Sequence, residues 1–196
     1  MIQKIPEPVG IPSEEEVAAE RERLQYRKRY RQTLRTTIYA LIVVAAVAVL
    51  LSTMFLPVLE VSGSSMEPTL EDGDIIVLIK TGEFETGDLI GFYYQNKLLL
   101  KRVIAGPGDT VDIDEDGNVY VNDVLLDEPY LTEKALGESD RDYPVQVPED
   151  RYFVMGDNRT TSIDSRSTAI GYIEEDQIVG KVVLRVWPFD RLSLIG

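Results

Sequence analysis

Cysteine and histidine are both absent from this chain of 196 residues. Without cysteine there is no disulfide framework, no thiolate nucleophile, no zinc finger and no iron–sulfur site. Without histidine there is no Ser/His/Asp triad and no imidazole ligand for a metal. Acid–base chemistry near neutral pH then requires an Asp, Glu, Lys or Tyr with a shifted pKa. We therefore expect no metal and no cofactor, and any hydrolytic site needs an unusual base.

Basic residues are scarce, with 20 Lys and Arg against 34 Asp and Glu and a net charge of -14. This negative charge argues against a general nucleic-acid-binding protein, because phosphate contacts need clustered Lys and Arg. The charge is also divided unevenly. Residues 1–35 carry a net charge of +2, residues 36–59 carry no charge, and the rest of the chain carries -16. The sequence therefore falls into three zones.

The uncharged zone contains an apolar run of 22 residues, 38–59. As a helix this run would be about 33 Å long, which matches a bilayer core. The alternatives are a buried helix of a soluble protein and a cleavable signal peptide, for which residues 61–63 would pass as a cleavage site. The length of the apolar run and of the segment before it favours a retained transmembrane anchor over a signal peptide.

The flanks of this run predict its orientation. Between Arg21 and Arg35 there are seven basic residues and one acidic residue, and an acidic segment follows the run. The positive-inside rule then places the N-terminus in the cytoplasm, with the basic segment at anionic lipid headgroups. We expect a single-pass protein of the cell membrane in three parts: a cytoplasmic tail and basic juxtamembrane segment (1–35), a transmembrane helix (36–59) and an extracytoplasmic domain (60–196).

The expected extracytoplasmic domain consists of short apolar runs separated by turns. Turn residues stand at 95–96, 116–117 and 122–123. Such spacing with little helical periodicity is typical of antiparallel β structure. We predict a mainly β fold, a barrel-like antiparallel domain that follows one N-terminal transmembrane helix. The runs expected to form strands are 75–79, 88–94, 97–105, 152–155 and 178–187.

Residues 62–70 combine hydroxyls, a glycine and a proline directly after the predicted membrane exit. This composition suits a tight turn that presents a serine to solvent, although composition alone favours a plain juxtamembrane linker. The G-x-S-x-G elbow is absent, and so is the S-x-x-K pattern. The segment alone leaves both interpretations open.

Lys101 is the lysine most suited to act as a base among the seven in the chain. It lies within an apolar run, and on a strand it shares a face with Leu99, Val103 and Ala105. Burial there would disfavour its ammonium form, and a pKa 2 to 3 units below about 10.4 would suit catalysis near neutral pH. The alternative is a lysine whose ammonium group reaches water from a strand edge.

Residues 156–166 alternate acidic, basic and hydroxyl side chains. A hydroxyl from this segment would orient a neutral lysine towards a serine, and so complete a group of nucleophile, base and orienting residue. The same alternation also fits a salt-bridged loop with a purely structural role.

Taken together, the three segments resemble the bacterial type I signal peptidases, over about residues 36–190. The family pattern S-M-x-P-T appears at 65–69, and K-R-V-x-G-x-P-G-D appears at 101–109 with a local difference at Ile104 and Ala105. The pattern G-D-N-R-x-x-S-x-D-S-R is complete at 156–166.

This resemblance implies a role for individual residues. Ser65 matches the nucleophile, Lys101 the general base, and Ser162 the hydroxyl that orients the base. Arg102 and Asp157 would form a pair that braces the site. The other bracing residues implied are Asp164 and Arg166, and the substrate pocket would involve Val61, Ser62, Met66, Leu70 and Leu100.

One position departs from part of the family. Gly63 stands where some members have a serine whose hydroxyl joins the oxyanion hole. As in the members that carry glycine, the hole would rest on the backbone N–H of Ser65. The short stretch between Asp109 and Pro148 resembles the compact form of the family, and a lysine base resembles the bacterial type.

The resemblance implies a membrane-anchored serine endopeptidase that removes signal peptides from exported preproteins after small residues, at sites of the A-x-A type. Its partners would be preproteins, the lipid bilayer and the neighbouring secretion translocon. Two alternatives stay open. One is a Ser/Lys peptidase of narrower range, such as a pilin or conjugation-factor processing enzyme or a self-cleaving repressor. The other is a single-pass scaffold with an acidic β-rich binding domain.

Overall fold

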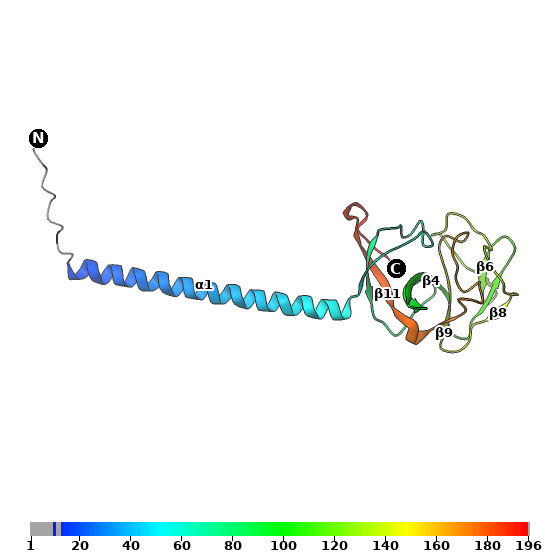
Figure 1. Cartoon of the computed structure of the whole chain (residues 1–196), viewed down its shortest axis with the longest axis horizontal. Helices are drawn as coiled ribbons and strands as arrows, with labels where there is room; N and C mark the ends of the chain where they lie inside the picture. Colours follow the sequence, from blue (N-terminus) through cyan, green and yellow to red (C-terminus); the bar gives the residue numbers. More distant parts are fainter. Residues whose placement is uncertain (1–9, 11–12, 196) are drawn as a thin grey trace, which may run out of the picture. The chain divides into compact units, whose positions relative to one another are not determined.

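The computed structural model describes residue 10 and residues 13–195. These form two units, one ending at Leu51 and one running from Ser52. Residues 1–9 and 11–12 of the expected cytoplasmic tail and juxtamembrane segment (1–35) lie outside the described residues. Helix α1 (Glu14–Phe55) dominates the first unit and is continuous through the charged and apolar segments (Figure 1).

The start of α1 carries a capping box. Ser13 Oγ accepts a hydrogen bond from the Glu16 N–H at 3.2 Å, and the Ser13 N–H donates to Glu16 Oε2 at 2.9 Å. These bonds satisfy backbone donors that have no partner within the helix. Over Glu14–Leu50 the helix is long and apolar enough to cross a membrane, judged by length and composition. Whether it spans a bilayer, and in which direction, stays a prediction.

The second unit is built almost entirely from antiparallel strands in two sheets, which confirms the predicted fold class. The large sheet has the order β1-β2-β11-β3-β4-β9-β10, and β12 pairs with β11. Its strands are β1 (Val58–Glu60), β2 (Ile75–Ile79), β3 (Leu89–Tyr94), β4 (Lys97–Ala105), β9 (Arg151–Met155), β10 (Ile173–Glu174), β11 (Ile178–Trp187) and β12 (Ser193–Leu194).

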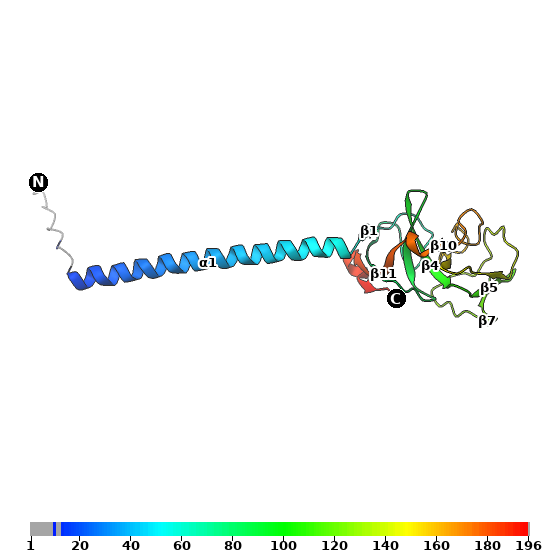
Figure 2. The same cartoon turned by 90° about the horizontal axis from the view of Figure 1, so that it is seen from below.

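The small sheet has the order β7-β6-β5-β8. In Figures 1 and 2 its strands lie on one side of the β-rich unit, β11 lies on the other, and β4 lies between them. In the described residues neither strand order closes on itself, so the sheets are open and the predicted barrel-like domain is not a closed barrel. The strands of the small sheet are β5 (Thr110–Ile113), β6 (Val119–Val121), β7 (Val124–Leu125) and β8 (Val145–Gln146), and two short 3-10 helices complete the unit, η1 (Glu175–Gln177) and η2 (Phe189–Arg191).

Two-residue turns explain the register of two hairpins. Gln95 and Asn96 have φ of 45° and 64°, and Asn122 and Asp123 have φ of 52° and 65°. Two consecutive residues with positive φ are the requirement of a type I′ turn, whose twist matches that of paired strands. The first turn fixes the pairing of β3 with β4, including Ile90 opposite Lys101.

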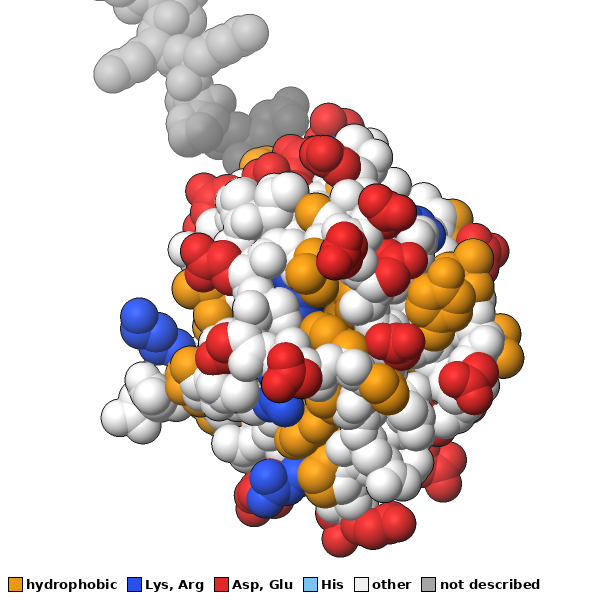
Figure 3. Space-filling view, turned by 90° about the vertical axis from the view of Figure 1, so that its right-hand side faces the viewer, with side chains coloured by type: hydrophobic (Ala, Val, Ile, Leu, Met, Phe, Trp, Pro, Cys, Tyr) orange, Lys and Arg blue, Asp and Glu red, His pale blue; other side chains and the backbone are white. Residues whose placement is uncertain are grey.

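Three hydrophobic clusters form the interior. One lies between the two sheets, and its fully buried members include Ile104, Val111 and Phe153. A second joins the segment after β1 to β2, and a third lies among β3, β4 and β9. Acidic side chains are spread over the face shown in Figure 3, with few Lys and Arg among them, in keeping with the negative charge of the chain after residue 60.

Candidate active site

The candidate nucleophile lies in a turn that follows β1. Gly63 has φ of 89°, a conformation that favours glycine, and its N–H donates to Asp72 Oδ1 at 2.7 Å. The Glu67 N–H then donates to the Ser64 carbonyl at 3.2 Å, which closes the turn around Ser65. Gly63, at the position where some members of the family have a serine, therefore shapes the turn that presents Ser65.

Ser65 and Lys101 are brought together from positions 36 residues apart. Lys101 Nζ lies 2.9 Å from Ser65 Oγ, within hydrogen-bonding distance. Lys101 is only 4% exposed on β4, so its side chain does not reach for water as the alternative interpretation required. A hydroxyl and an amine at this separation have the geometry needed for direct proton transfer.

Burial lowers the pKa of Lys101, because removing the ammonium from water disfavours the charged form. The Asp164 carboxylate acts in the opposite direction, Arg166 lowers the pKa further, and Asp157 raises it. The net direction is downward. A larger fraction of Lys101 is therefore neutral at a given pH than for an exposed lysine.

An ion pair beside the lysine joins β4 to the segment after β9. Arg102 Nε donates to Asp157 Oδ1 at 2.8 Å, and Arg102 Nη2 donates to Asp157 Oδ2 at 2.6 Å. Thr69 Oγ1 also donates to Asp157, at 2.5 Å. Both charged residues are buried. Such bidentate pairing restricts orientation as well as position, so it ties the serine turn, β4 and the 156–166 segment together.

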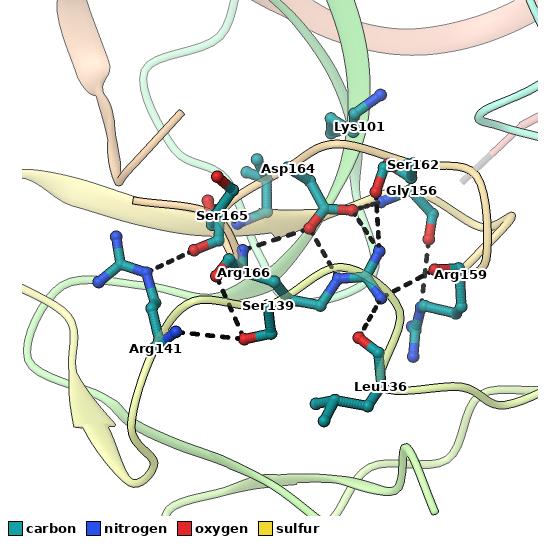
Figure 4. A network of polar contacts seen from close by, with 12 residues as sticks. Lys101, Leu136, Ser139, Arg141, Gly156, Arg159, Ser162, Asp164, Ser165 and Arg166 are labelled. Carbon is teal, nitrogen blue, oxygen red and sulfur yellow. Dashed lines mark hydrogen bonds and ion pairs between the residues drawn. The ribbon is translucent and has the colours of Figure 1, made fainter. Parts of the chain in front are cut away.

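A second buried ion pair organises the 156–166 segment itself (Figure 4). Arg166 Nε and Nη2 bind the two oxygens of Asp164 at 2.8 and 2.9 Å. Asp164 Oδ2 also accepts the Gly156 N–H at 2.9 Å. Arg166 Nη2 donates to the Ser162 carbonyl at 3.2 Å. The pair therefore fixes the backbone on both sides of Ser162.

Ser162 lies in the site, but the bond expected for an orienting residue is not formed. Its side chain is buried, and within the described part of the chain its Oγ has no hydrogen-bond partner. Figure 4 shows it beside Gly156. A Cβ on Gly156 would lie 2.5 Å from Ser162 Cβ and 2.6 Å from the Ser65 carbonyl oxygen. Ser162 and Ser65 therefore approach each other across a glycine with no room for a side chain.

The five residues expected for a substrate pocket differ in exposure. Val61, Met66 and Leu70 are buried together in one hydrophobic cluster, Leu100 packs against it, and Ser62 is exposed. Three of them thus serve as core residues, and the substrate pocket stays a prediction.

Two strand edges near Ser65 and Lys101 have no strand partner in the described structure. β1 pairs only with β2, and the part of β4 before Arg102 pairs only with β3. The Ser65 N–H likewise has no acceptor among the described residues. Open edges pair with an extended peptide by backbone hydrogen bonds, and a free N–H donates a hydrogen bond to a developing oxyanion.

Sequence reasoning missed several contributors to this network. Arg159 was part of the matched pattern without a role, and Glu128 and Tyr130 were not considered. Arg159 and Glu128 form a fully buried ion pair, and Tyr130 lies against Arg102. The mixed charge of 156–166 indicated that this segment forms ion pairs. The sequence around residue 128 has no pattern that would identify it as the partner of Arg159.

The family model and the curated relatives that match this chain point to the same family. The family model described as "Signal peptidase, peptidase S26" matches residues 34–187. Signal peptidase I U of Bacillus subtilis is 36% identical over 177 residues, which cover 84% of this chain and 94% of that protein. Signal peptidase IB of Staphylococcus aureus is 39% identical over 153 residues, which cover 68% of this chain and 78% of that protein. A crystal structure of a signal peptidase I from Enterococcus faecalis is 30% identical, covers 50% of this chain and 96% of its own, and has a TM-score of 0.41.

Proposed function

The chain belongs to the signal peptidase family, peptidase S26, and on that premise we propose that it cleaves signal peptides with Ser65 as nucleophile and Lys101 as general base. The family is one of serine peptidases, and exported preproteins are its substrates. The observation that carries the catalytic assignment is the 2.9 Å separation of Lys101 Nζ and Ser65 Oγ in a site where burial lowers the pKa of the lysine.

The neutral Lys101 amine takes the proton of Ser65 as Oγ attacks the carbonyl carbon of the scissile bond. The negative charge that develops on the carbonyl oxygen is stabilised by the Ser65 N–H. The Lys101 ammonium then protonates the leaving amine, which departs as the N-terminus of the mature protein. The remaining ester is hydrolysed by water whose proton passes to Lys101, and this releases the carboxylate of the signal peptide and regenerates Ser65.

The surroundings of the proposed nucleophile support the proposed preference for small residues at A-x-A sites. An extended substrate would pair with the open edges of β1 and β4, and alternate side chains would then face the protein. The cluster of Val61, Met66 and Leu70 is already packed, with Leu100 beside it. Only small side chains fit against such a surface without displacing it.

Membrane attachment is proposed from the apolar helix α1. The apolar part of α1, from residue 36 to Phe55, would span the cell membrane once, and residues 1–35 would lie in the cytoplasm. The span expected at 36–59 is thus shorter at its end, because Val58 and Leu59 belong to β1, which opens the proposed extracytoplasmic peptidase domain. Preproteins, the bilayer and the nearby translocon would be its partners. The chemistry needs no cofactor, because the amine and the hydroxyl supply the base and the nucleophile.

The test is cleavage of a purified preprotein with an A-x-A site by Ser65→Ala, Lys101→Ala and two matched controls. Ser64→Ala removes a neighbouring exposed hydroxyl, and Lys97→Ala removes an exposed lysine from the same strand. We expect both site variants to fold and lose cleavage, and both controls to keep it. Turnover in both folded site variants would refute the dyad. An acylating serine-directed inhibitor should label Ser65, whereas a scaffold would not react, and a panel of preproteins separates broad from narrow processing.

A further inference from the structure

One segment outside the family patterns reaches the proposed site from the small sheet. We call residues 126–132 the strap. It begins directly after β7, where the Leu126 N–H donates to the Val119 carbonyl of β6 at 2.8 Å. Within it the Leu131 N–H donates to the Glu128 carbonyl at 3.2 Å, which makes a turn that carries Glu128 and Tyr130. The strap therefore links the small sheet to the residues that brace Lys101.

Tyr130 covers the face of the Arg102 guanidinium. Arg102 Cζ lies 3.9 Å from the centroid of the Tyr130 ring. The edge of the same guanidinium binds Asp157 through two hydrogen bonds, and its Nη1 donates to the Gly87 carbonyl at 2.7 Å. The aromatic face attracts the cation and shields it from water. Arg102 is thus restricted on its face by Tyr130 and on its edge by Asp157 and Gly87.

Glu128 fixes the Tyr130 ring and connects it to the other side of the site. The Tyr130 hydroxyl donates to Glu128 Oε1 at 3.1 Å. Burial and the neighbouring Glu128 carboxylate raise the pKa of Tyr130, so the hydroxyl stays protonated and able to donate. Glu128 forms a buried ion pair with Arg159, whose Nε donates to the Gly156 carbonyl at 3.1 Å. A continuous series of contacts therefore leads from Gly156 through the strap to Arg102.

We propose that Tyr130 is a positioning residue of the peptidase site, which holds the Arg102 guanidinium against Asp157 while Glu128 holds the ring in place. The proposal rests on the proposed function, in which Lys101 is the base. The charged groups that act on Lys101 are Asp164, Arg166 and Asp157. Asp164 is paired with Arg166, and Asp157 is paired with Arg102. The effect of the Asp157 carboxylate on the pKa of Lys101 therefore depends on how closely Arg102 is held against it.

Loss of the ring would loosen Arg102 and leave more of the Asp157 charge to act on Lys101. A carboxylate near an amine favours its ammonium form. The proposed base would then be protonated over a wider pH range. The consequence is a change in the pH dependence of cleavage, which a general loss of packing would not produce.

The experiment measures kcat/KM for preprotein cleavage against pH, with the full chain in detergent or lipid. Tyr130→Leu removes the ring, and Tyr130→Phe keeps it but loses the bond to Glu128. Tyr172→Leu is the matched control, because Arg141 Cζ lies 4.5 Å from the Tyr172 ring centroid in a stack of the same kind that does not involve Asp157. Thermal unfolding of each variant establishes that it is folded.

We expect the acidic limb of Tyr130→Leu to move to higher pH by about one unit, which makes cleavage about tenfold slower on the limb and nearly normal above it. Tyr130→Phe should move the limb less in the same direction, and Tyr172→Leu should leave it unmoved. The positioning role would be overturned if Tyr130→Leu lost kcat/KM equally at every pH or kept the wild-type pH profile. It would also be overturned if Tyr172→Leu shifted the acidic limb as far as Tyr130→Leu. If Tyr130→Leu does not fold, Tyr130→Phe decides the matter: a limb at higher pH supports the role, and an unmoved limb overturns it.

Failure of the proposed function gives a different result. If folded Lys101→Ala still cleaves the preprotein, the lysine is not the base and the dyad is wrong. If Lys101→Ala is inactive while the limb of folded Tyr130→Leu is unmoved, the dyad stands and only the positioning role of Tyr130 is wrong.

Discussion

Replacing Gly156 with alanine tests how closely the proposed site is packed. The added Cβ would lie 2.6 Å from the Ser65 carbonyl oxygen, so Ser65 or Gly156 must move by about 0.8 Å to restore an ordinary contact, which begins at 3.4 Å. The same Cβ would meet Ser162 Cβ at 2.5 Å, so displacing Ser65 alone does not relieve the clash. Overpacking of this kind costs about 1–3 kcal/mol of stability. A displacement approaching 1 Å in a catalytic group can cost about 100-fold in rate.

The assay compares kcat/KM for preprotein cleavage and the free energy of unfolding in Gly156→Ala and in Gly106→Ala. Gly106 is a matched control. A Cβ added there would lie 3.7 Å from Asp109 Oδ2 and 3.9 Å from Tyr152 Cε1, and both are ordinary contacts. We expect Gly156→Ala to fold with a loss of about 100-fold in kcat/KM and Gly106→Ala to cleave at the wild-type rate. Wild-type kinetics in Gly156→Ala, or an equal loss in both variants, would refute the reasoning.

Three further predictions concern the same network. Because burial lowers the pKa of Lys101 and the neutral amine is the active form, kcat/KM should rise with pH through a pKa below that of a free lysine; a profile without such a limb contradicts the assignment. Ser162→Ala should lower kcat/KM less than Lys101→Ala and alter the pH profile, and a wild-type profile would argue against an orienting role. Arg166→Leu should lower the free energy of unfolding by about 3–5 kcal/mol, because it leaves Asp164 buried without its partner, and urea denaturation at neutral pH checks this.

Much of the fold follows from signals that are local in the sequence. The apolar run at 75–79 coincides with β2, and the runs on either side of Gln95 and Asn96 coincide closely with β3 and β4. Turn residues that adopt positive φ determine which residues pair across these strands, so register was encoded within about ten residues. Closure into a barrel was not encoded locally, because it depends on whether distant edge strands meet.

The residues of the proposed site also divide into those that the sequence predicts and those that depend on tertiary contacts. Residues of the family patterns were named because their spacing is distinctive, whereas Glu128 and Tyr130 lie in a segment with no periodicity of its own. Their roles depend on which arginines reach them from other segments, and that is a tertiary property. The orienting bond of Ser162 was expected from resemblance, yet the described structure has no partner for its hydroxyl. Pattern matching identified the residue but did not determine its rotamer.

In a chain without histidine, the choice of arginine as the partner of each buried carboxylate bears on the proposed role of Lys101 as the base. The buried carboxylates around the proposed site are each matched by a guanidinium: Asp157 by Arg102, Asp164 by Arg166 and Glu128 by Arg159. Arginine suits such buried pairs because its planar guanidinium can bind both oxygens of a carboxylate at once. Lysine partners would titrate in a range closer to that of Lys101 and couple to it. With arginine in all three pairs, Lys101 has no lysine partner in this network among the described residues, which suits its proposed role as a base without imidazole.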